Sequence, residues 1–318
     1  MLEYCRNWQK EPTKVKTRIA AIDFGTNTAR LLIADKKQSG FEQIALQRDV
    51  VRMGGGFSRQ QGLSPEAWQR GLDCLKRFSV LIADAGGVES VRAVATSAVR
   101  DAVNGSRFID HVFRETGIEL NAIDGICEGE LTLAGVLAGL DCPGEELFVF
   151  DVGGGSTEYT LARKGVAEFV RSLPLGVVRL TEGQGSLEAM KDKITRELSQ
   201  LESELCRQGC RPGESAILVG TAGTATTLAA ISMEMSDYDY RRVNNAVISR
   251  TEIEQILERL LPLSPSQRLA VPGLEKGRED LIIAGIAITL ATMDLAGQEQ
   301  LKVSDYGLLE GLVVSGLF

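Results

Sequence analysis

Histidine is nearly missing from this 318-residue chain, which contains a single one, His111. A Ser-His-Asp triad or a histidine-built metal site would have to use this residue, which lies inside an expected helix, FIDHVFRET. The six cysteines include no CxxC pair, so a zinc site is not expected. Cys206 and Cys210 lie one helical turn apart, and free thiols are favoured over a redox or metal pair. These absences leave the chemistry to carboxylates.

Aromatic residues and positive charge are also in short supply. Aromatics make up 5% of the chain and the formal net charge is −8. Base stacking and general nucleic-acid binding need aromatic side chains and distributed lysine and arginine, so no nucleic-acid partner is expected. No apolar run reaches the roughly 18 residues of a membrane span, and the amino terminus lacks the apolar stretch of a signal peptide. We therefore expect a cytoplasmic protein without a membrane partner.

One short pattern is present twice. Residues 19–34 read IAAIDFGTNTARLLIA, and residues 147–162 read LFVFDVGGGSTEYTLA. Each copy contains an apolar strand, an Asp-x-Gly turn rich in hydroxyl groups, and a second strand. A turn of this kind presents backbone N–H groups to phosphate oxygens. Two such turns facing each other would hold a phosphate chain from both sides.

The two copies differ at one strand position. When Asp23 is aligned with Asp151, Arg30 falls on Glu158. A charge in an otherwise apolar strand is expected to face a site and not a core. Arg30 could pair with phosphate through two hydrogen bonds. Asp151 and Glu158 are suitable ligands for Mg²⁺, which prefers carboxylate, water and phosphate oxygens.

Three further features are candidates for the site. Glu128 begins an expected helix, where it is either a general base for an attacking water or a first-turn acid that suits the positive helix end. Arg100 either neutralises phosphate or forms a surface salt bridge with Asp101. The sequence GTAGTATTL at 220–228 is a third glycine- and threonine-rich turn that opens a helix, where backbone amides could face an anion.

Strand-like and helix-like segments alternate along the whole chain. This alternation predicts an α/β fold with mostly buried sheets. Residues 96–101 are expected to form a loop, and a helix is expected at 128–140. The repeat, whose aspartates lie 128 positions apart, predicts two related domains.

Several motifs resemble those of the exopolyphosphatase and guanosine pentaphosphate phosphohydrolase family, within the actin/Hsp70/sugar-kinase superfamily. The resemblance extends from residue 19 to residue 318, in the family's order. Its stretches are AAIDFGTNTARLLIA, ATSAVRDAVNG, FDVGGGSTEYTLA, SLPLGVVRLTE, VGTAGTATTLAA, PGLEKGREDLIIAGIAI and VSDYGLLEGL. DVGGGSTE followed by SLPLGVVRLTE is the most specific part, because the related kinases share only the looser Asp-x-Gly turns.

The resemblance implies two ribonuclease-H-like (actin-like ATPase) domains with the active site in the cleft between them. Domain I, with the first turn, is expected at 18–126 and 303–318, and domain II, with the second turn, at 127–302. Residues 1–17 are expected to form a flexible tail. The implied reaction removes a terminal phosphate from inorganic polyphosphate or guanosine pentaphosphate, with Mg²⁺ as cofactor.

The resemblance also implies roles for individual residues. Glu128 matches the catalytic glutamate and Glu158 the second essential acid. The implied metal ligands are Asp151, Glu158 and Asp23. The expected phosphate-binding residues are Gly25, Thr26, Asn27, Thr28, Arg30, Arg100, Gly153, Gly154, Gly155, Ser156 and Thr157.

One segment departs from the family pattern. The usual Glu-Glu-Ala-Arg is replaced by Cys127-Glu128-Gly129-Glu130. An acid in place of a base beside the catalytic carboxylate would raise its pKa or repel a polyanion. The expected consequence is a change in efficiency or in substrate preference.

Two other functions stay open. An actin-fold kinase for a small metabolite would need an adenosine pocket, to which the turn at 220–228 could contribute. A non-catalytic sensor of polyphosphate or guanosine pentaphosphate would explain the altered residues around Glu128. The sequence does not choose between the two substrates, since both present a terminal phosphoanhydride, and it leaves a homodimer open.

Overall fold

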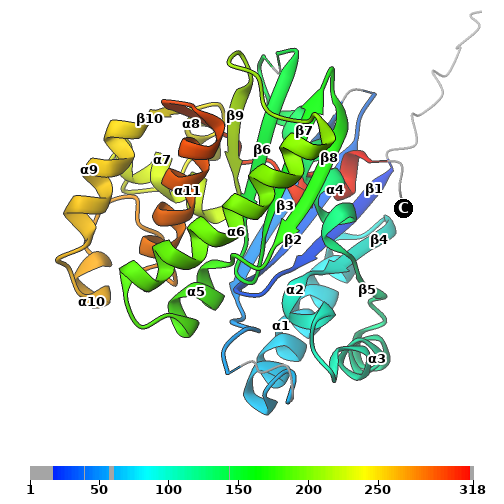
Figure 1. Ribbon diagram of the computed structural model, residues 1–318. Helices are drawn as coiled ribbons and strands as arrows, with labels where there is room; N and C mark the ends of the chain where they lie inside the picture. The colour runs from blue at the N-terminus through cyan, green and yellow to red at the C-terminus, as the bar shows by residue number, and fades with distance from the viewer. Residues whose placement is uncertain (1–16, 39, 57–60, 143, 316–318) are drawn as a thin grey trace, which may run out of the picture.

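The computed structural model describes residues 17–38, 40–56, 61–142 and 144–315, which form two mixed β-sheets with helices packed against them (Figure 1). Apart from Thr17, the predicted flexible tail at 1–17 lies outside the described residues. No helix in these ranges combines the length and the apolar character that a membrane crossing requires.

The first sheet has the strand order β3-β2-β1-β4-β5. Its strands are β1 (Arg18–Phe24), β2 (Thr28–Lys36), β3 (Phe41–Val50), β4 (Val88–Ala95) and β5 (Leu120–Ala122). Strands β1, β2 and β3 pair antiparallel, whereas β4 and β5 run parallel to β1. The accompanying helices are α1 (Pro65–Ala85), α2 (Ser97–Arg100) and α3 (Gly105–Thr116). Helix α1 begins at Pro65, because the Ser64 hydroxyl accepts the Ala67 N–H and proline occupies the first helical position.

The second sheet has the strand order β10-β11-β9-β6-β7-β8. Its strands are β6 (Glu146–Val152), β7 (Thr157–Arg163), β8 (Val166–Leu173), β9 (Ile217–Thr221), β10 (Val247–Ser249) and β11 (Gln300–Val303). The helices of this part are α5 (Val177–Gly183), α6 (Leu187–Gln208), α7 (Ala222–Ser232), α8 (Tyr240–Val243), α9 (Arg250–Leu260), α10 (Pro265–Arg268) and α11 (Ile282–Ala296). Figure 1 shows α6 across the face of β7 and β8, with α11 beside it. The largest apolar core of the described residues lies between this sheet and these helices.

Two helices connect the sheets. Helix α4 (Gly125–Gly139) packs against β7 and β8, whereas α12 (Leu308–Val314) packs against β1 and β2, and the two helices contact each other. Their crossing depends on glycine. A Cβ at Gly135 would lie 1.9 Å from the Gly307 carbonyl oxygen, and one at Gly311 would lie 1.9 Å from that of Leu131. The backbones of α4 and α12 therefore meet without intervening side chains.

The doubled pattern is present as two antiparallel hairpins, β1–β2 and β6–β7. Their registers place Asp23 opposite Arg30 and Asp151 opposite Glu158. The predicted domain boundaries fall near the start of α4 and at the end of β11. The division into domains at these positions remains a prediction.

Two local expectations were wrong. The segment expected as a loop at 96–101 contains the short helix α2. Helix α4 begins at Gly125 and not at Glu128, because the Asp124 carboxylate caps it. This carboxylate accepts the N–H groups of Ile126 and Cys127 at 3.0 and 2.8 Å. Glu128 consequently lies just inside the helix.

Candidate active site

The two Asp-x-Gly turns have the same backbone hydrogen bond. The Gly25 N–H donates to the Thr28 carbonyl, and the Gly153 N–H donates to the Ser156 carbonyl, both over 2.9 Å. The segments that follow β3 and β8 donate further backbone hydrogen bonds to the turns. The N–H groups of Val51 and Arg52 bond the Asn27 carbonyl, and that of Val177 bonds the Gly153 carbonyl. Each turn is thus held open at the edge of its sheet.

The turns face and touch each other. A Cβ at Gly154 would lie 2.9 Å from the Thr26 Cβ and 3.2 Å from the Asn27 nitrogen. Only glycine fits at this contact, because any side chain would collide with the opposite turn. The facing arrangement expected from the doubled pattern is therefore present.

A cavity of about 450 Å³ opens between the two sheets. We call it the substrate cavity. Its lining includes both turns and three of the predicted site acids, namely Asp23, Gly25, Thr26, Asn27, Thr28, Arg30, Glu128, Asp151, Gly153 and Gly154. Five other predicted site residues do not line it, namely Arg100, Gly155, Ser156, Thr157 and Glu158. Among these, the Thr157 hydroxyl is turned away and donates to the Leu175 carbonyl.

The first hairpin supplies a satisfied ion pair. The Arg30 guanidinium lies 2.8 Å from the Asp23 carboxylate, with both side chains largely buried. Burial alone would lower the pKa of Arg30, but Asp23 and Glu310 outweigh it and the pKa is raised. Arg30 therefore carries its charge in the substrate cavity, and the predicted metal ligand Asp23 is already engaged by a cation.

The second hairpin supplies two acids without such a cation. Burial raises the pKa of Asp151 to about 6, and Arg30 offsets this only in part. Burial and the neighbouring Asp151 raise the pKa of Glu158 to about 7. The Ser172 hydroxyl donates to Glu158 Oε1 over 2.6 Å, but no described residue gives Oε2 a hydrogen bond. This orphaned oxygen is buried beside a second carboxylate.

Glu128 is the third buried acid of the site. Burial raises its pKa well above the usual value, and the carboxylates of Glu158, Asp151 and Asp23 add to this effect. The opposing charge is Arg100, whose guanidinium lies 3.5 Å from Glu128 Oε2. A carboxyl with a raised pKa, exposed to the substrate cavity, is suited to accept a proton from water.

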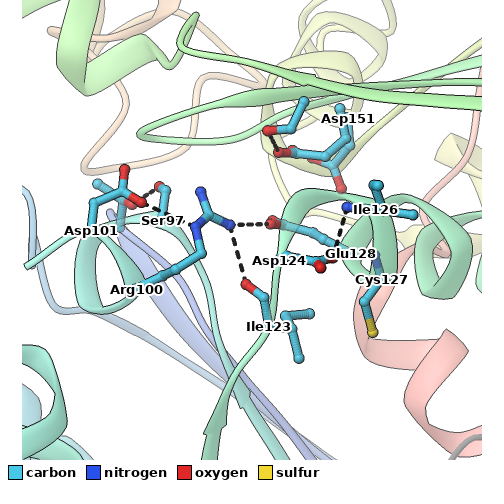
Figure 2. A network of polar contacts seen from close by, with 12 residues as sticks. Ser97, Arg100, Asp101, Ile123, Asp124, Ile126, Cys127, Glu128 and Asp151 are labelled. Atoms are coloured by element: carbon cyan, nitrogen blue, oxygen red, sulfur yellow. Dashed lines mark hydrogen bonds and ion pairs between the residues drawn. The ribbon is translucent and has the colours of Figure 1, made fainter.

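Arg100 forms the salt bridge with Asp101 that was one of its two expected roles, whereas neutralisation of phosphate stays a prediction. Figure 2 shows it reaching from Asp101 on one side to Glu128 on the other, with the Ile123 carbonyl as a third partner. The distances are 3.0 Å to Asp101, 3.5 Å to Glu128 and 3.2 Å to Ile123. The salt bridge to Asp101 therefore coexists with contact to the candidate base.

The residues that depart from the family pattern do not line the substrate cavity. Glu130 is exposed, and Cys127 packs against the apolar cluster around α12. Gly129 lies against β7 and β8, where a Cβ would be 2.5 Å from Val170 Cγ1. Of this segment only Glu128 reaches the cavity.

The acids suit a divalent metal of the oxygen-binding kind. Asp151 and Glu158 present buried carboxylate oxygens whose mutual repulsion a cation would relieve, and Glu158 Oε2 has no partner among the described residues. Within those residues, no three His, Cys, Asp or Glu side chains form a complete cage. The donor set thus fits an ion that is held by one or two carboxylates together with water and substrate phosphate.

The substrate cavity is also lined by residues that the motifs did not single out. Burial and the charges of Arg278 and Arg30 lower the pKa of Arg48 to about 8, and burial and Arg30 lower that of Arg278 to about 10. Three arginines therefore converge on one cavity. Tyr238 and Tyr240 also line this cavity. Only Arg278 had a sequence signal, since it lies within the GREDL stretch of the resemblance.

The third turn also reaches the substrate cavity. Ala222 and Gly223, at the start of α7, line it. A Cβ at Gly223 would lie 1.7 Å from an Arg278 guanidinium nitrogen, so this arginine rests directly on the turn. Glu310 is a further acid of the cavity, and burial raises its pKa to about 7.

Two sheets that meet across glycine turns, buried acids and converging arginines define a phosphate-handling protein with two actin-like domains. The more specific assignment comes from similarity to known proteins. The chain belongs to the Ppx/GppA phosphatase family, whose family model matches residues 32–317. The resemblance stated from the motifs is confirmed.

Three similar proteins support this membership. The bifunctional 3-dehydroquinate synthase/phosphatase of Fusobacterium nucleatum is 31% identical over 94% of this chain, which spans about half of that protein's length (46%). Exopolyphosphatase 2 of Mycobacterium tuberculosis is 32% identical over 94% of this chain and 98% of that protein. The crystal structure of an exopolyphosphatase from Cytophaga hutchinsonii is 29% identical, with a TM-score of 0.85 over 93% of this chain and 96% of that one. The predicted α/β fold with two actin-like domains is thereby confirmed.

Proposed function

We propose that this chain is an exopolyphosphatase, which hydrolyses the terminal phosphoanhydride of inorganic polyphosphate with the help of Mg²⁺. The observation that carries the proposal is that one cavity is lined by both glycine turns and by Glu128 and Asp151. The relatives named as exopolyphosphatases support the choice of substrate. Guanosine pentaphosphate is the second candidate substrate, because its terminal phosphoanhydride would meet the same groups.

The turns bind the terminal phosphates in this mechanism. The backbone N–H groups of Thr26, Asn27 and Gly154 do not close the turns, unlike those of Gly25 and Gly153, and they face the phosphate oxygens. Arg30 neutralises part of the phosphate charge. Arg100 approaches from the side of Glu128 and offsets charge that develops in the transition state. Asp151 and Glu158 are the proposed ligands of Mg²⁺, which when bound would neutralise phosphate oxygens and polarise the phosphoanhydride.

Glu128 is the proposed general base. It accepts a proton from a water molecule while the water oxygen forms a bond to the terminal phosphorus. The bond between this phosphorus and its bridging oxygen breaks, and the electron pair stays with the shortened chain. Orthophosphate and a chain one unit shorter are the products.

A direct test compares phosphate release from polyphosphate and from guanosine pentaphosphate, each with and without Mg²⁺. We expect Mg²⁺-dependent release from polyphosphate. Replacing Glu128→Gln should lower kcat by about 10³-fold while binding and fold are kept, since general-base catalysis contributes roughly 10²–10⁴-fold. Near-native turnover by this variant would contradict the assignment. Release from guanosine pentaphosphate alone would change the substrate and keep the mechanism.

The two exposed tyrosines bear on that choice of substrate. Tyr238 and Tyr240 line the substrate cavity beside Arg48 and Arg278. The arginines suit further phosphates of a chain, whereas an aromatic ring would also accept a stacked guanine. Comparing kcat/KM for the two substrates after Tyr240→Leu separates these uses. A loss confined to guanosine pentaphosphate would indicate base stacking.

The kinase and the sensor are the alternatives to this proposal. ATP-dependent phosphorylation of a sugar or an acid, with no polyphosphate hydrolysis, would favour the kinase. Tight binding of polyphosphate without Mg²⁺-dependent release would favour the sensor. The exposed position of Glu130, outside the substrate cavity, argues against the sensor.

The proposal includes a cytoplasmic location. Its support is that the five cysteines of the described ranges, Cys206 and Cys210 among them, are free thiols, the state maintained in the cytosol. Cell fractionation tests it. A homodimer and the lack of a nucleic-acid partner stay predictions, which sedimentation and nucleic-acid binding assays would check.

A further inference from the structure

A second cavity, of about 300 Å³, lies on the other side of the facing turns. Thr26 and Gly154 line both this cavity and the substrate cavity. The two turns therefore lie between the second cavity and the substrate cavity. The polar and small groups of the second cavity include Ser97 and Arg179.

Only a thin layer of atoms from the two turns and from Ser97 separates the two cavities. Within this layer, the Thr26 and Ser97 hydroxyls form a hydrogen bond of 2.8 Å. A Cβ at Gly155 would lie 2.1 Å from Ser97 Oγ, so the second turn contributes backbone alone at this contact. These contacts are made by two small hydroxyl side chains and by glycine backbone.

We propose that orthophosphate leaves through this second cavity, the exit cavity, while the shortened chain stays in the substrate cavity. This inference rests on the proposed function. In a phosphoryl transfer the attacking and leaving oxygens lie roughly in line, on opposite sides of the phosphorus. Once the bridging P–O bond has broken and the bond to the water oxygen has formed, the shortened chain blocks the way back. The freed phosphate then lies on the side away from that chain.

Positive charge connects the reaction site with the exit cavity. Asp101 is held by Arg100 at 3.0 Å, beside Glu128, and by Arg179 at 3.3 Å, at the exit cavity. Figure 2 shows Ser97, Arg100 and Asp101 together on this side of Glu128. Phosphate can replace the Asp101 carboxylate on each guanidinium in turn, because both anions accept the same paired hydrogen bonds. Glu182, the acidic residue of the exit cavity, opposes tight binding, which suits passage rather than storage.

Filling the exit cavity tests the proposal. A Cβ at Gly183 meets no atom within 4 Å, so Gly183→Trp places a large ring at the cavity without a backbone clash. Gly185→Trp is the matched control, since Gly185 has the same open surroundings and does not line the exit cavity. Single-turnover cleavage of short polyphosphate is measured by acid quench, and free phosphate by a fluorescent phosphate sensor.

We expect Gly183→Trp to cleave in a single turnover within about twofold of the native rate, but to release phosphate about tenfold more slowly in steady state, with a burst of enzyme-bound phosphate. Gly185→Trp should match the native chain in both measurements. Unchanged steady-state release by Gly183→Trp, or an equal fall in both rates, would overturn the exit route. Absence of cleavage by the native chain would instead overturn the proposed function, and the exit route with it.

A pair of charge variants gives an independent readout. Removing the cation with Arg179→Gln should weaken product inhibition by orthophosphate several-fold, whereas removing the carboxylate with Glu182→Gln should strengthen it. Opposite shifts from these neighbours support phosphate binding in the exit cavity. Equal or absent shifts would contradict it.

Discussion

The first and second hairpins have the same backbone hydrogen bond and register, but their side chains differ in charge. Both turns close with a 2.9 Å hydrogen bond, and both registers set an aspartate against the same strand position. In the first, Asp23 faces Arg30 and the pair is satisfied at 2.8 Å. In the second, Asp151 faces Glu158, and burial raises the pKa of both acids, with Asp23 adding to the shift of Asp151 and Asp151 adding to that of Glu158. The second hairpin therefore has two buried acids and no cation of its own to neutralise them.

The difference explains how one fold element can serve two tasks. Arg30 brings a permanent cation to the substrate cavity, and Asp23 fixes its position. Asp151 and Glu158 instead favour whatever cation arrives, because a bound ion would remove the cost of two buried acids. In our proposal, substrate phosphate therefore meets the permanent charge of Arg30 from one hairpin and a bound cation at the other.

The largest effect on activity is expected from removing an acid of the second hairpin. Glu158→Gln should lower kcat by about 10³-fold and weaken Mg²⁺ binding, since it removes one of two proposed metal ligands. Calorimetric titration of Mg²⁺ in the presence of a non-hydrolysable phosphate analogue measures the second effect directly. Glu130→Gln is the control, because it removes an exposed acid outside the cavity. Native Mg²⁺ affinity in the Glu158→Gln variant would exclude this residue as a ligand.

A smaller effect on activity is expected from removing the arginine of the first hairpin. Arg30→Gln should lower kcat/KM by about 10²-fold, mainly through KM, because it removes the charge that we propose contacts substrate phosphate. It also leaves Asp23 buried without its partner. The double variant Asp23→Asn/Arg30→Gln therefore serves as the control, which should recover thermal stability and keep the high KM. Recovery of KM in the double variant would show that Arg30 acts only by neutralising Asp23.

Both hairpins could be predicted from the sequence, whereas the roles of their side chains stay predictions. Each lies within one continuous stretch, so the alternation of apolar residues and the Asp-x-Gly turn define it locally. The pairing of Asp23 with Arg30 was not anticipated. It depends on the exact strand register and leaves Asp23 less available to a metal than Asp151.

The arginines that line the substrate cavity from outside the hairpins could not be predicted in the same way. Arg48 on β3 and Arg278 before α11 are far apart in the chain and meet only because the two sheets close around the cleft. No local pattern marks Arg48, which sits in an exposed strand. The exit cavity is also formed by separate segments, which the short contacts of glycine bring together. Such features follow from tertiary packing and not from local sequence.

Of the two hairpins, the second is the one expected to make stability depend on pH. The pKa of Glu158 is about 7 in the folded chain, against an ordinary value of 4.5. The protonated group therefore favours folding, and this contribution is full below pH 4.5 and lost as the pH rises through 7. Without metal, the free energy of unfolding should fall by about 2 kcal/mol more between roughly pH 5 and pH 8 in the native chain than in Glu158→Gln. Denaturant titrations at the two pH values measure it, and parallel losses in both proteins would contradict the shift.

The smallest effect is expected from an acid near the second hairpin that faces away from it. If the buried acids Asp151, Glu158 and Glu128 define the chemistry, then Glu130, exposed on α4, should matter little. Glu130→Arg restores the basic residue of the family pattern, and we expect kcat/KM for polyphosphate to change by less than about threefold, because an exposed charge is screened by water and salt. Assays at low and high ionic strength separate long-range attraction from a local role. A gain of 100-fold that persists at high salt would mean that Glu130 acts on Glu128 directly, and that the second hairpin does not account for the acidity of the site by itself.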